Sequence, residues 1–340
     1  MSHSFPEPSP ILFFETVNAY QRSAAIRAAI ELDVFTHIGA GKSTASEVAE
    51  ASESTERGLR ILCDSLTVMG FLTKQDGRYQ LTQDSAVFLD RRSPAFIGGA
   101  IEFLLSPMLV ESFEHLTEAV RKGGTALPEA GSIAPEHPVW VRFARAMAPM
   151  MTMPSQLMAQ LIAQQMPERK LKVLDIAAGH GMFGIAVARQ LPEAEITALD
   201  WPNVLEVAQA NAEQAGVGER YHLLPGSAFE VDYGSDYDLI LLTNFLHHFD
   251  PQTCEQLLRR VHAALSRNGK AVTLEFIPNE DRVSPPGSAM FSLVMLGSTP
   301  HGDAYTFSEL ERMFATAGFT RSMFHPLPPS FPQQIVVSDK

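Results

Sequence analysis

The segment from Leu171 to Gly184, LKVLDIAAGHGMFG, constrains the fold of this chain more than any other stretch. It opens with an apolar run that is too short for an ordinary helix and is typical of a buried strand. Gly179 and Gly181 then form a turn in which the backbone can approach a ligand closely. The segment therefore predicts a strand, a tight turn and a helix whose first amides point at whatever binds there.

The glycines of this turn also fit the pattern G-x-G-x-x-G, formed by Gly179, Gly181 and Gly184, which on its own would suggest a dinucleotide. Asp175, four residues before Gly179, stands where dinucleotide sites usually have an apolar residue. A carboxylate beside the turn repels a diphosphate, but it suits a cationic ligand that carries an amino acid, such as S-adenosylmethionine (SAM). A turn that serves packing alone is the remaining alternative.

The stretch VLDIAAGHG resembles motif I of the class I SAM-dependent methyltransferases. After it, strands and helices alternate, which is typical of a parallel, doubly wound sheet. The predicted strands are 195–200, 220–224, 237–242 and 270–276, and the predicted helices are 181–190, 203–215, 252–265 and 307–317. Two last strands, 322–325 and 334–337, are expected to form an antiparallel hairpin on the sheet edge. We therefore predict an α/β fold with a Rossmann-like SAM-binding sheet over residues 166–340.

The N-terminal region, residues 1–95, is predicted to be mainly α-helical. Apolar residues recur at helical spacing from Ile11 to Leu32, which indicates one or two amphipathic helices. A short helix follows Thr44, and a longer one runs from Thr55 to Met69. Two short strands around the turn Gln75–Arg78 are typical of a β-hairpin wing, so this region is expected to be a winged-helix-like domain. Residues 96–165 are expected to form a helical connector.

Charge argues against nucleic acid or an anionic membrane as the main partner, because 26 basic and 39 acidic residues give a formal charge of −13. Residues 1–95 alone hold nine Lys or Arg and twelve Asp or Glu. The recognition helix of a DNA-binding winged helix would offer only Arg57 and Arg60, whereas phosphate neutralisation needs clustered basic residues. We therefore expect this domain to mediate dimerisation rather than bind DNA.

The two cysteines, Cys63 and Cys254, have neither the spacing of zinc ligands nor that of a disulfide framework. They fit a reducing compartment, and we expect no metal site. The N-terminus lacks a basic segment followed by an apolar one, and charged residues interrupt the first apolar stretch. The sequence therefore predicts neither a signal peptide nor a membrane span, and it indicates a cytoplasmic protein.

Polar residues at the ends of the predicted strands are candidates for the cofactor site. Asp200 ends the second strand, where a carboxylate can bind both ribose hydroxyls, and a helix cap before Pro202 is its alternative role. Trp201 could cover the adenine face, and Gly226–Phe229 follow the third strand, where such enzymes hold adenine. The predicted cofactor-binding residues are Asp175, Ala177, Gly179, Gly181, Asp200, Trp201, Gly226, Ser227, Ala228, Phe229, Thr243 and Asn244.

Two imidazoles, His247 and His248, follow the fourth strand and are expected at the carboxyl edge of the sheet, beside the cofactor. A solvated loop is the alternative. Here the chain resembles, over nearly its whole length, the two-domain O-methyltransferases of the caffeic acid and acetylserotonin type. In that family a Leu-His-Asp-Trp-like motif supplies the general base, which implies this role for His247. A flanking family glutamate on the fifth strand matches Glu275.

Several residues depart from the family pattern. Ser227 stands for the aspartate of the Gly-Asp-Met-Phe motif, and His248 and Phe249 stand for the aspartate and tryptophan after the base. Ala304 replaces a second glutamate, with Asp303 adjacent as a stand-in. These changes bear on the oxygen acceptor more than on SAM.

Residues 96–165 are rich in methionine and aromatic residues. Most of these are expected to form a core or a dimer seam, but polarizable side chains also suit the wall of a pocket for flat organic molecules. The predicted substrate-binding residues are Trp140, Phe143, Met147, Met290, Phe291, Met295 and Asp303.

Together these features predict a homodimeric, SAM-dependent methyltransferase that acts on a hydroxyl of a small aromatic or natural-product-like molecule. A small-molecule N- or S-methyltransferase, in which His247 only orients the acceptor, is the first alternative. A relative that uses SAM without methylation is the second. A DNA-binding regulator is disfavoured by the acidic N-terminal region.

Overall fold

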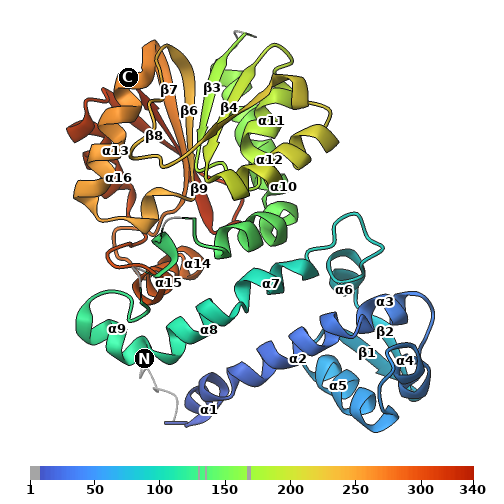
Figure 1. Cartoon of the computed structure of the whole chain (residues 1–340). Helices are drawn as coiled ribbons and strands as arrows, with labels where there is room; N and C mark the ends of the chain where they lie inside the picture. Colours follow the sequence, from blue (N-terminus) through green and yellow to red (C-terminus); the bar gives the residue numbers. More distant parts are fainter. Residues whose placement is uncertain (1–7, 129–130, 135, 167–169) are drawn as a thin grey trace, which may run out of the picture. The chain divides into compact units, whose positions relative to one another are not determined.

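The computed structural model describes residues 8–128, 131–134, 136–166 and 170–340. The chain divides into two compact units, Met1–Ile101 and Glu102–Lys340. The predicted sheet domain and the predicted connector from Glu102 onward fall in the second unit, whereas residues 96–101 belong to the first, so the boundary lies six residues later than predicted. The elements of each unit are labelled in Figure 1.

The first unit is mainly helical, as the sequence predicts. Its helical segments are α1 (Ile11–Val17), α2 (Ala19–Glu31), α3 (Val34–Gly39), α4 (Ala45–Ala51), α5 (Glu56–Val68), α6 (Gln83–Phe88) and the 3-10 turn η1 (Gly98–Ala100). Strands β1 (Leu72–Gln75) and β2 (Arg78–Leu81) pair antiparallel, with Gln75 opposite Arg78. Asp76 and Gly77 between them have φ angles of 49° and 75°, which suit a two-residue hairpin turn. The predicted wing is confirmed.

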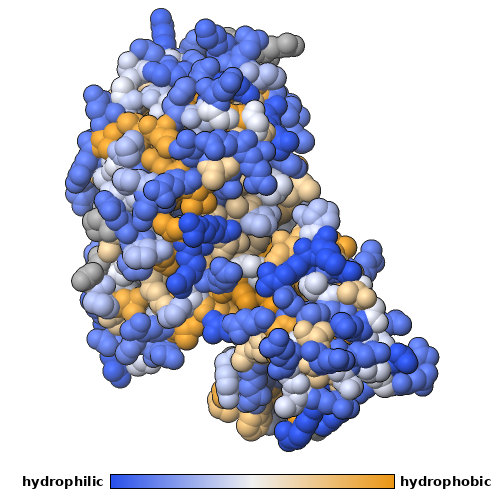
Figure 2. Space-filling model, turned by 45° about the vertical axis from the view of Figure 1, so that its right-hand side comes forward, coloured by the Kyte–Doolittle hydropathy of each residue, from blue (hydrophilic) through white to orange (hydrophobic). Residues whose placement is uncertain are grey.

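Helix α1 differs from the other helices of this unit because none of its residues is buried. Ile11, Leu12 and Phe13 are all exposed, whereas Val34 and Phe35 of α3 lie in the core with Leu59 of α5. Figure 2 shows one face of the molecule, on which apolar residues form patches between hydrophilic ones. An exposed apolar helix of this kind is typical of a surface that a partner covers.

The second unit begins with the helices expected between residues 96 and 165. They are α7 (Ile101–Leu104, which starts at the unit boundary), α8 (Pro107–Glu114), α9 (Leu116–Lys122), the 3-10 turn η2 (Gly131–Ile133) and α10 (Val139–Gln165). Helix α10 contains Pro149 and Pro154 yet continues for 27 residues. Its C-terminal half packs on the sheet through Met158 and Ile162.

A seven-stranded sheet follows, in the order β5-β4-β3-β6-β7-β9-β8. Its strands are β3 (Lys172–Ile176), β4 (Glu195–Asp200), β5 (Tyr221–Pro225), β6 (Tyr237–Thr243), β7 (Leu265–Phe276), β8 (Arg321–His325) and β9 (Gln333–Asp339). Strands β3 to β7 run parallel, and β9 pairs antiparallel with both β7 and β8. The predicted parallel sheet and its terminal hairpin are confirmed. Strand β7 begins five residues earlier than predicted, because Leu265 pairs with Tyr237 before a register shift.

Helices cover both faces of this sheet, as Figure 1 shows. The connecting segments are α11 (Met182–Gln190), α12 (Pro202–Gln214), η3 (Gly218–Arg220), η4 (Leu246–His248), α13 (Pro251–Ala264), α14 (Pro286–Ala289), α15 (Phe291–Ser298) and α16 (Phe307–Ala317). Val173 and Leu239 pack in one core with α10, α11 and α12. Leu174 and Ile240, one position further along each strand, pack in a second core with α13 and α16. The alternation follows from the two-residue period of a strand.

The strand order reverses between β3 and β6, so the connections after these two strands leave in opposite directions. In open α/β sheets this switch point is where ligands bind, beyond the carboxyl ends of the strands. Among the described residues, no helix has both the length and the apolar character needed to cross a membrane.

We predict that Gly184→Ala destabilises the protein, because a β-carbon at Gly184 would lie 2.8 Å from Ile196 Cγ2 and 2.9 Å from Asp175 Oδ2. Such overpacking costs about 1–3 kcal/mol, although alanine favours a helix. Gly297→Ala is the matched control, since its β-carbon would meet nothing closer than 3.5 Å in a helix of the same unit. Urea unfolding measures both variants, and equal stability of the two would contradict the prediction.

Candidate active site

The chain leaves the carboxyl ends of β3 and β6 through left-handed backbone conformations. Ala177 has a φ of 55° directly after β3, and Asn244 has a φ of 53° directly after the buried Thr243 at the end of β6. Gly179 and Gly181 continue the first turn with φ angles of 57° and 75°. The predicted turn therefore lies at the switch point of the sheet, and α11 begins directly after it, at Met182.

Gly181 is required by close packing as well as by its φ angle. A β-carbon there would lie 2.6 Å from Tyr221 Oη and 3.1 Å from the side chain of Ala208. The turn consequently sits against β5 and α12. Asn211 of α12 adds a hydrogen bond of 2.8 Å from its Nδ2 to the carbonyl of His180.

Asp175 lies in β3, just before the turn, and is fully buried. Its Oδ2 accepts a hydrogen bond of 3.0 Å from the amide of Gly184, while Oδ1 is buried without a partner among the described residues. Burial raises the pKa of Asp175 to about 7. In this structure the carboxylate predicted to face the ligand holds the first turn of α11 in place.

Asp200 lies beside the turn, at the end of β4. Its Oδ2 accepts a hydrogen bond of 2.8 Å from the amide of Gly179, and its Oδ1 accepts one of 2.7 Å from the amide of Trp201. Burial raises the pKa of Asp200 to about 6. The alternative that Asp200 caps α12 is not observed, because Trp201 occupies the N-cap position. Each carboxylate oxygen can still accept a further hydrogen bond.

The loop predicted to hold adenine, Gly226–Phe229, follows β5. A β-carbon at Gly226 would lie 2.4 Å from Val231 Cγ2, and the φ of Gly226 is 137°. The hydroxyl of Ser227 accepts a hydrogen bond of 3.2 Å from the amide of Phe229, so this side chain shapes the loop. Ala228 is buried, and its carbonyl accepts the hydroxyl of Tyr233.

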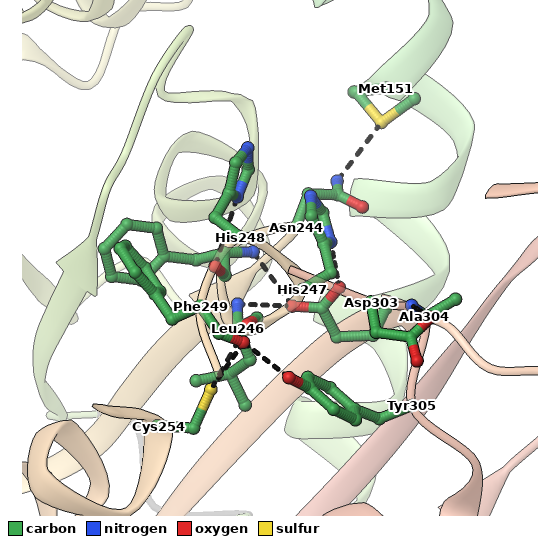
Figure 3. Close-up of polar contacts among 12 residues, drawn as sticks. Met151, Asn244, Leu246, His247, His248, Phe249, Cys254, Asp303, Ala304 and Tyr305 are labelled. Carbon is green, nitrogen blue, oxygen red and sulfur yellow. Dashed lines mark hydrogen bonds and ion pairs between the residues drawn. The ribbon is translucent and has the colours of Figure 1, made fainter. Parts of the chain in front are cut away.

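His247 and Glu275 form a buried pair at the carboxyl edge of the sheet. They are 4% and 3% exposed, and His247 Nδ1 bonds to Glu275 Oε2. The other carboxylate oxygen, Oε1, accepts hydrogen bonds from the amides of Phe245 and Leu246, at 2.9 and 2.8 Å. Glu275 thus fixes both the imidazole ring and the backbone that carries it. Figure 3 shows the loop that carries His247 and His248.

Three residues that the sequence did not indicate as site residues also support this loop. Tyr305 donates its hydroxyl to the carbonyl of Phe249, and Cys254 Sγ lies 3.2 Å from the carbonyl of Leu246. Met151 of α10 approaches Asn244 Nδ2 at 4.0 Å, and Asn244 Oδ1 has no partner among the described residues. No spacing in the sequence predicts these roles of Tyr305 and Cys254, because both side chains contact backbone carbonyls of the loop after β6.

Asp303 occupies the position next to the missing family glutamate. Its amide donates a hydrogen bond of 2.9 Å to the carbonyl of His247. Its carboxylate, however, accepts from Arg282 at 3.1 Å and from the amide of Ala304 at 2.8 Å. Asp303 therefore contacts His247 through its backbone amide, whereas its side chain pairs with Arg282.

His248 lies beside His247, with ring centroids 4.2 Å apart. Its Nδ1 is 3.2 Å from the carbonyl of Phe245, and its ring meets Trp140 edge-on at 5.2 Å. Burial, together with the neighbouring His247, holds the pKa of His248 well below its usual range. Both imidazoles are buried, so the alternative of a solvated loop is not observed.

The structure brings some of the predicted substrate-binding residues to this site. Trp140 meets His248, and Phe291 of α15 meets His247 edge-on at 4.8 Å. Phe143 stacks at 5.8 Å on His180, a buried residue of the glycine turn that sequence reasoning passed over. Met147 and Met295 are buried, whereas Met290 is 62% exposed.

Burial lowers the pKa of His180 to about 4, so the ring is neutral at neutral pH. Its Nδ1 accepts a hydrogen bond of 3.2 Å from the amide of Met182, the first residue of α11. Across the described ranges of the chain, no group of three or more His, Cys, Asp or Glu side chains could hold a metal ion.

These features define a class of protein. The parallel sheet has a glycine turn at its switch point and a carboxylate, Asp200, at the next strand end. The buried amide oxygen of Asn244 has no partner among the described residues. Together these groups fit a nucleoside that carries a charged amino acid. The fold is that of a class I SAM-dependent methyltransferase.

Comparison with known proteins agrees. Residues 113–320 match the model of the O-methyltransferase domain, and residues 14–91 match that of the O-methyltransferase dimerisation domain. A solved structure of a putative O-methyltransferase from Nostoc punctiforme is 59% identical, with a TM-score of 0.95, over 98% of this chain and 100% of that one. Human N-acetylserotonin methyltransferase in complex with SAM has a TM-score of 0.83 at 21% identity, over 100% of this chain and 99% of that one.

Among curated relatives, the 3-hydroxy-5-methyl-1-naphthoate 3-O-methyltransferase of Streptomyces sahachiroi is 26% identical over 91% of this chain and 89% of its own length. The chain belongs to the O-methyltransferase family defined by this domain. It is an enzyme that uses SAM as its cofactor.

The buried carboxyl of Asp175 leads to a pH-dependent prediction. Its folded pKa is raised, so its contribution to stability is present below the unfolded pKa of about 3.9 and is lost as the pH rises towards 7. Asp175→Asn retains an acceptor for Gly184 and removes this dependence. Relative to the wild type, it should therefore gain about 1–2 kcal/mol of unfolding free energy between about pH 5.5 and pH 7.

Urea unfolding at several pH values measures this gain. The exposed Asp232→Asn is the control and should show no such trend. A constant difference between Asp175→Asn and wild type across this range would contradict the prediction.

Proposed function

We propose that this enzyme methylates a hydroxyl of a small aromatic, natural-product-like molecule, with His247 as the general base. The observation that carries the proposal is the buried pair of His247 and Glu275. A carboxylate on Nδ1 fixes the tautomer in which Nε2 carries a lone pair, and it stabilises the imidazolium formed on protonation. An amine or thiol acceptor has less need of such a base, so the pair favours oxygen over nitrogen or sulfur.

The relatives support this class of acceptor. By their names, one acts on a hydroxynaphthoate, one is an 8-O-methyltransferase of tetracenomycin polyketide synthesis, and one is a 6-O-methyltransferase of mitomycin biosynthesis. For this chain, Trp140, Phe143 and Phe291 are the residues we assign to the walls of the acceptor pocket. Their rings suit a flat, apolar molecule.

When bound, SAM supplies a methyl group on a positively charged sulfur, which accepts the electrons of the broken bond. The residues we assign to its binding are Asp200, which would hold the ribose hydroxyls, the glycine turn, the loop Gly226–Phe229, and Asn244. His247 then takes the proton of the acceptor hydroxyl at Nε2 while Glu275 keeps the ring in place.

We also propose that the protein works as a homodimer in the cytoplasm. The dimerisation-domain match covers residues 14–91, and the apolar side chains of α1 lie exposed in a single chain. The region from about residue 1 to 95 is the dimerisation domain in this proposal, residues 96–165 carry the pocket helices, and 166–340 bind the cofactor. Cys63 and Cys254 are both unpaired, which suits a reducing compartment.

Asp200→Ala is predicted to weaken the binding of both SAM and S-adenosylhomocysteine. The loss of charge-assisted hydrogen bonds to the ribose should cost on the order of 1.5–3 kcal/mol each. Titration calorimetry measures the affinities, with NAD as the ligand expected to be inert. Tight NAD binding without SAM binding would contradict the cofactor assignment.

His247→Ala is predicted to lower turnover by roughly 10²–10⁴-fold, the usual range for loss of a general base, while SAM affinity stays within a few-fold. Formation of S-adenosylhomocysteine from a panel of hydroxylated, amino and thiol acceptors measures this. His222→Ala, on an exposed imidazole of β5, is the control. Normal turnover in His247→Ala would favour an N- or S-methyltransferase instead.

A further inference from the structure

The first residue of β5, Tyr221, directs a buried hydroxyl at the glycine turn. The residue is 6% exposed, and its Oη has no hydrogen-bond partner among the described residues. A β-carbon at Gly181 would lie 2.6 Å from this Oη, and one at Gly184 would lie 3.4 Å from the ring carbon Cε2. The tyrosine therefore reaches from β5 to the turn and to the start of α11.

The register of the sheet explains this reach. Tyr221 is paired with Ile196 of β4, whereas Asp175 of β3 is paired with Ala198, two positions nearer the carboxyl edge. Ile196 and Ala198 both belong to the core that packs on α11 and α12, so Tyr221 and Asp175 lie on that same face of the sheet. Because Ala198 is small, the long side chain of Tyr221 can extend over it towards Asp175.

Asp175 supplies the complementary group. Its Oδ2 accepts a hydrogen bond from the amide of Gly184, while its Oδ1 is buried without a partner among the described residues. A β-carbon at Gly184 would lie 2.9 Å from Oδ2, so the carboxylate and the tyrosine ring approach the same point of α11. Burial, and then the charges of Asp175 and Asp200, raise the pKa of the Tyr221 hydroxyl well above its usual value, so the hydroxyl keeps its proton.

A donor and an acceptor, both buried, thus lie near each other beside the turn. Buried polar groups in proteins are almost always satisfied, and ordered water satisfies many of those that the chain itself does not. A water molecule between these two groups can accept a hydrogen bond from Tyr221 Oη and donate one to Asp175 Oδ1. One molecule would then satisfy both side chains and join them.

We propose that Tyr221 is a positioning residue for the cofactor, which holds the glycine turn through one water molecule bound between its hydroxyl and Asp175 Oδ1. This inference rests on the assignment of the turn to SAM in the proposed function. Asp200 holds the turn at Gly179, and Asp175 holds the start of α11. Tyr221 supports Gly181, between these two attachments, so the turn keeps the conformation that the cofactor meets.

Tyr221→Phe tests the link, because it removes the hydroxyl and keeps the ring. Titration calorimetry on the full-length protein should show that the Kd values of SAM and S-adenosylhomocysteine both rise by about threefold to tenfold, the scale of one lost hydrogen bond. The two should change alike, because they present the same amino-acid and nucleoside groups to the turn.

Tyr237→Phe is the matched control. Tyr237 is likewise buried and is the first residue of β6, and its hydroxyl donates a hydrogen bond of 2.9 Å to the carbonyl of Tyr233. Its loss removes the same chemical group from the same unit without touching the turn. Both Kd values should stay within about twofold of the wild type, whereas urea unfolding should show that Tyr221→Phe and Tyr237→Phe are both less stable.

Two further measurements separate positioning from a general loss of stability. In a double-mutant cycle on SAM affinity, Tyr221→Phe should have a smaller effect when Asp175→Asn is already present, because the water has lost its carboxylate. Carbon NMR of aspartate-labelled protein should show that Tyr221→Phe raises the pKa of Asp175, since a hydrogen bond to a carboxylate favours its ionised form. Burial and then the carboxylate of Asp200 also raise this pKa, and both are retained in the variant, while His180 of the turn is neutral.

Each outcome decides the question. Unchanged SAM affinity in Tyr221→Phe overturns the role of Tyr221, and greater stability of this variant in urea would show that the hydroxyl has no partner. An effect on SAM affinity that simply adds to that of Asp175→Asn, or an unchanged pKa of Asp175, overturns the link through water. If Asp200→Ala also binds SAM as the wild type does, the assignment of the turn to the cofactor fails, and not the role of Tyr221 alone.

Discussion

The site depends on one buried carboxylate, that of Glu275. A buried charge is unfavourable unless hydrogen bonds compensate it, and here the amides of Phe245 and Leu246 and the ring of His247 all donate to it. Because Glu275 lies within β7, an interior strand paired with β6 on one side and β9 on the other, the rigid sheet fixes its position. The loop that carries the two imidazoles is consequently held by the sheet rather than by its own short sequence.

Two other carboxylates organise the glycine turn in different ways. Asp200, at the end of β4, accepts a hydrogen bond from the amide of Gly179 in the turn, whereas Asp175, in β3, accepts one from the amide of Gly184 in α11. Burial raises the pKa of both, but only Asp200 retains an exposed side. Phe143 of α10 covers the same turn through His180, so the helix assigned to the acceptor pocket also packs on the segment assigned to the cofactor.

Much of the fold was predictable because it follows from local patterns. The short apolar run before Gly179 predicts β3, and the pair Asp76 and Gly77 predicts the hairpin turn, since both depend on conformations of a few neighbouring residues. The pairing of His247 with Glu275 was reachable only through family resemblance, because 28 positions separate them. The supporting contacts of Tyr305 and Cys254 left no pattern in the sequence, as each involves a backbone carbonyl.

The sequence by itself determined the order of strands and helices, the glycine turn, and the types of residue at the strand ends, because periodicity and backbone conformation are local properties. Only the tertiary structure decided what those residues do. It turned Asp175 towards Gly184, directed the carboxylate of Asp303 to Arg282, and set the two imidazoles side by side with their Nδ1 atoms bonded. The direction of a side chain and the tautomer of a ring depend on partners brought together by the sheet, which no spacing along the chain specifies.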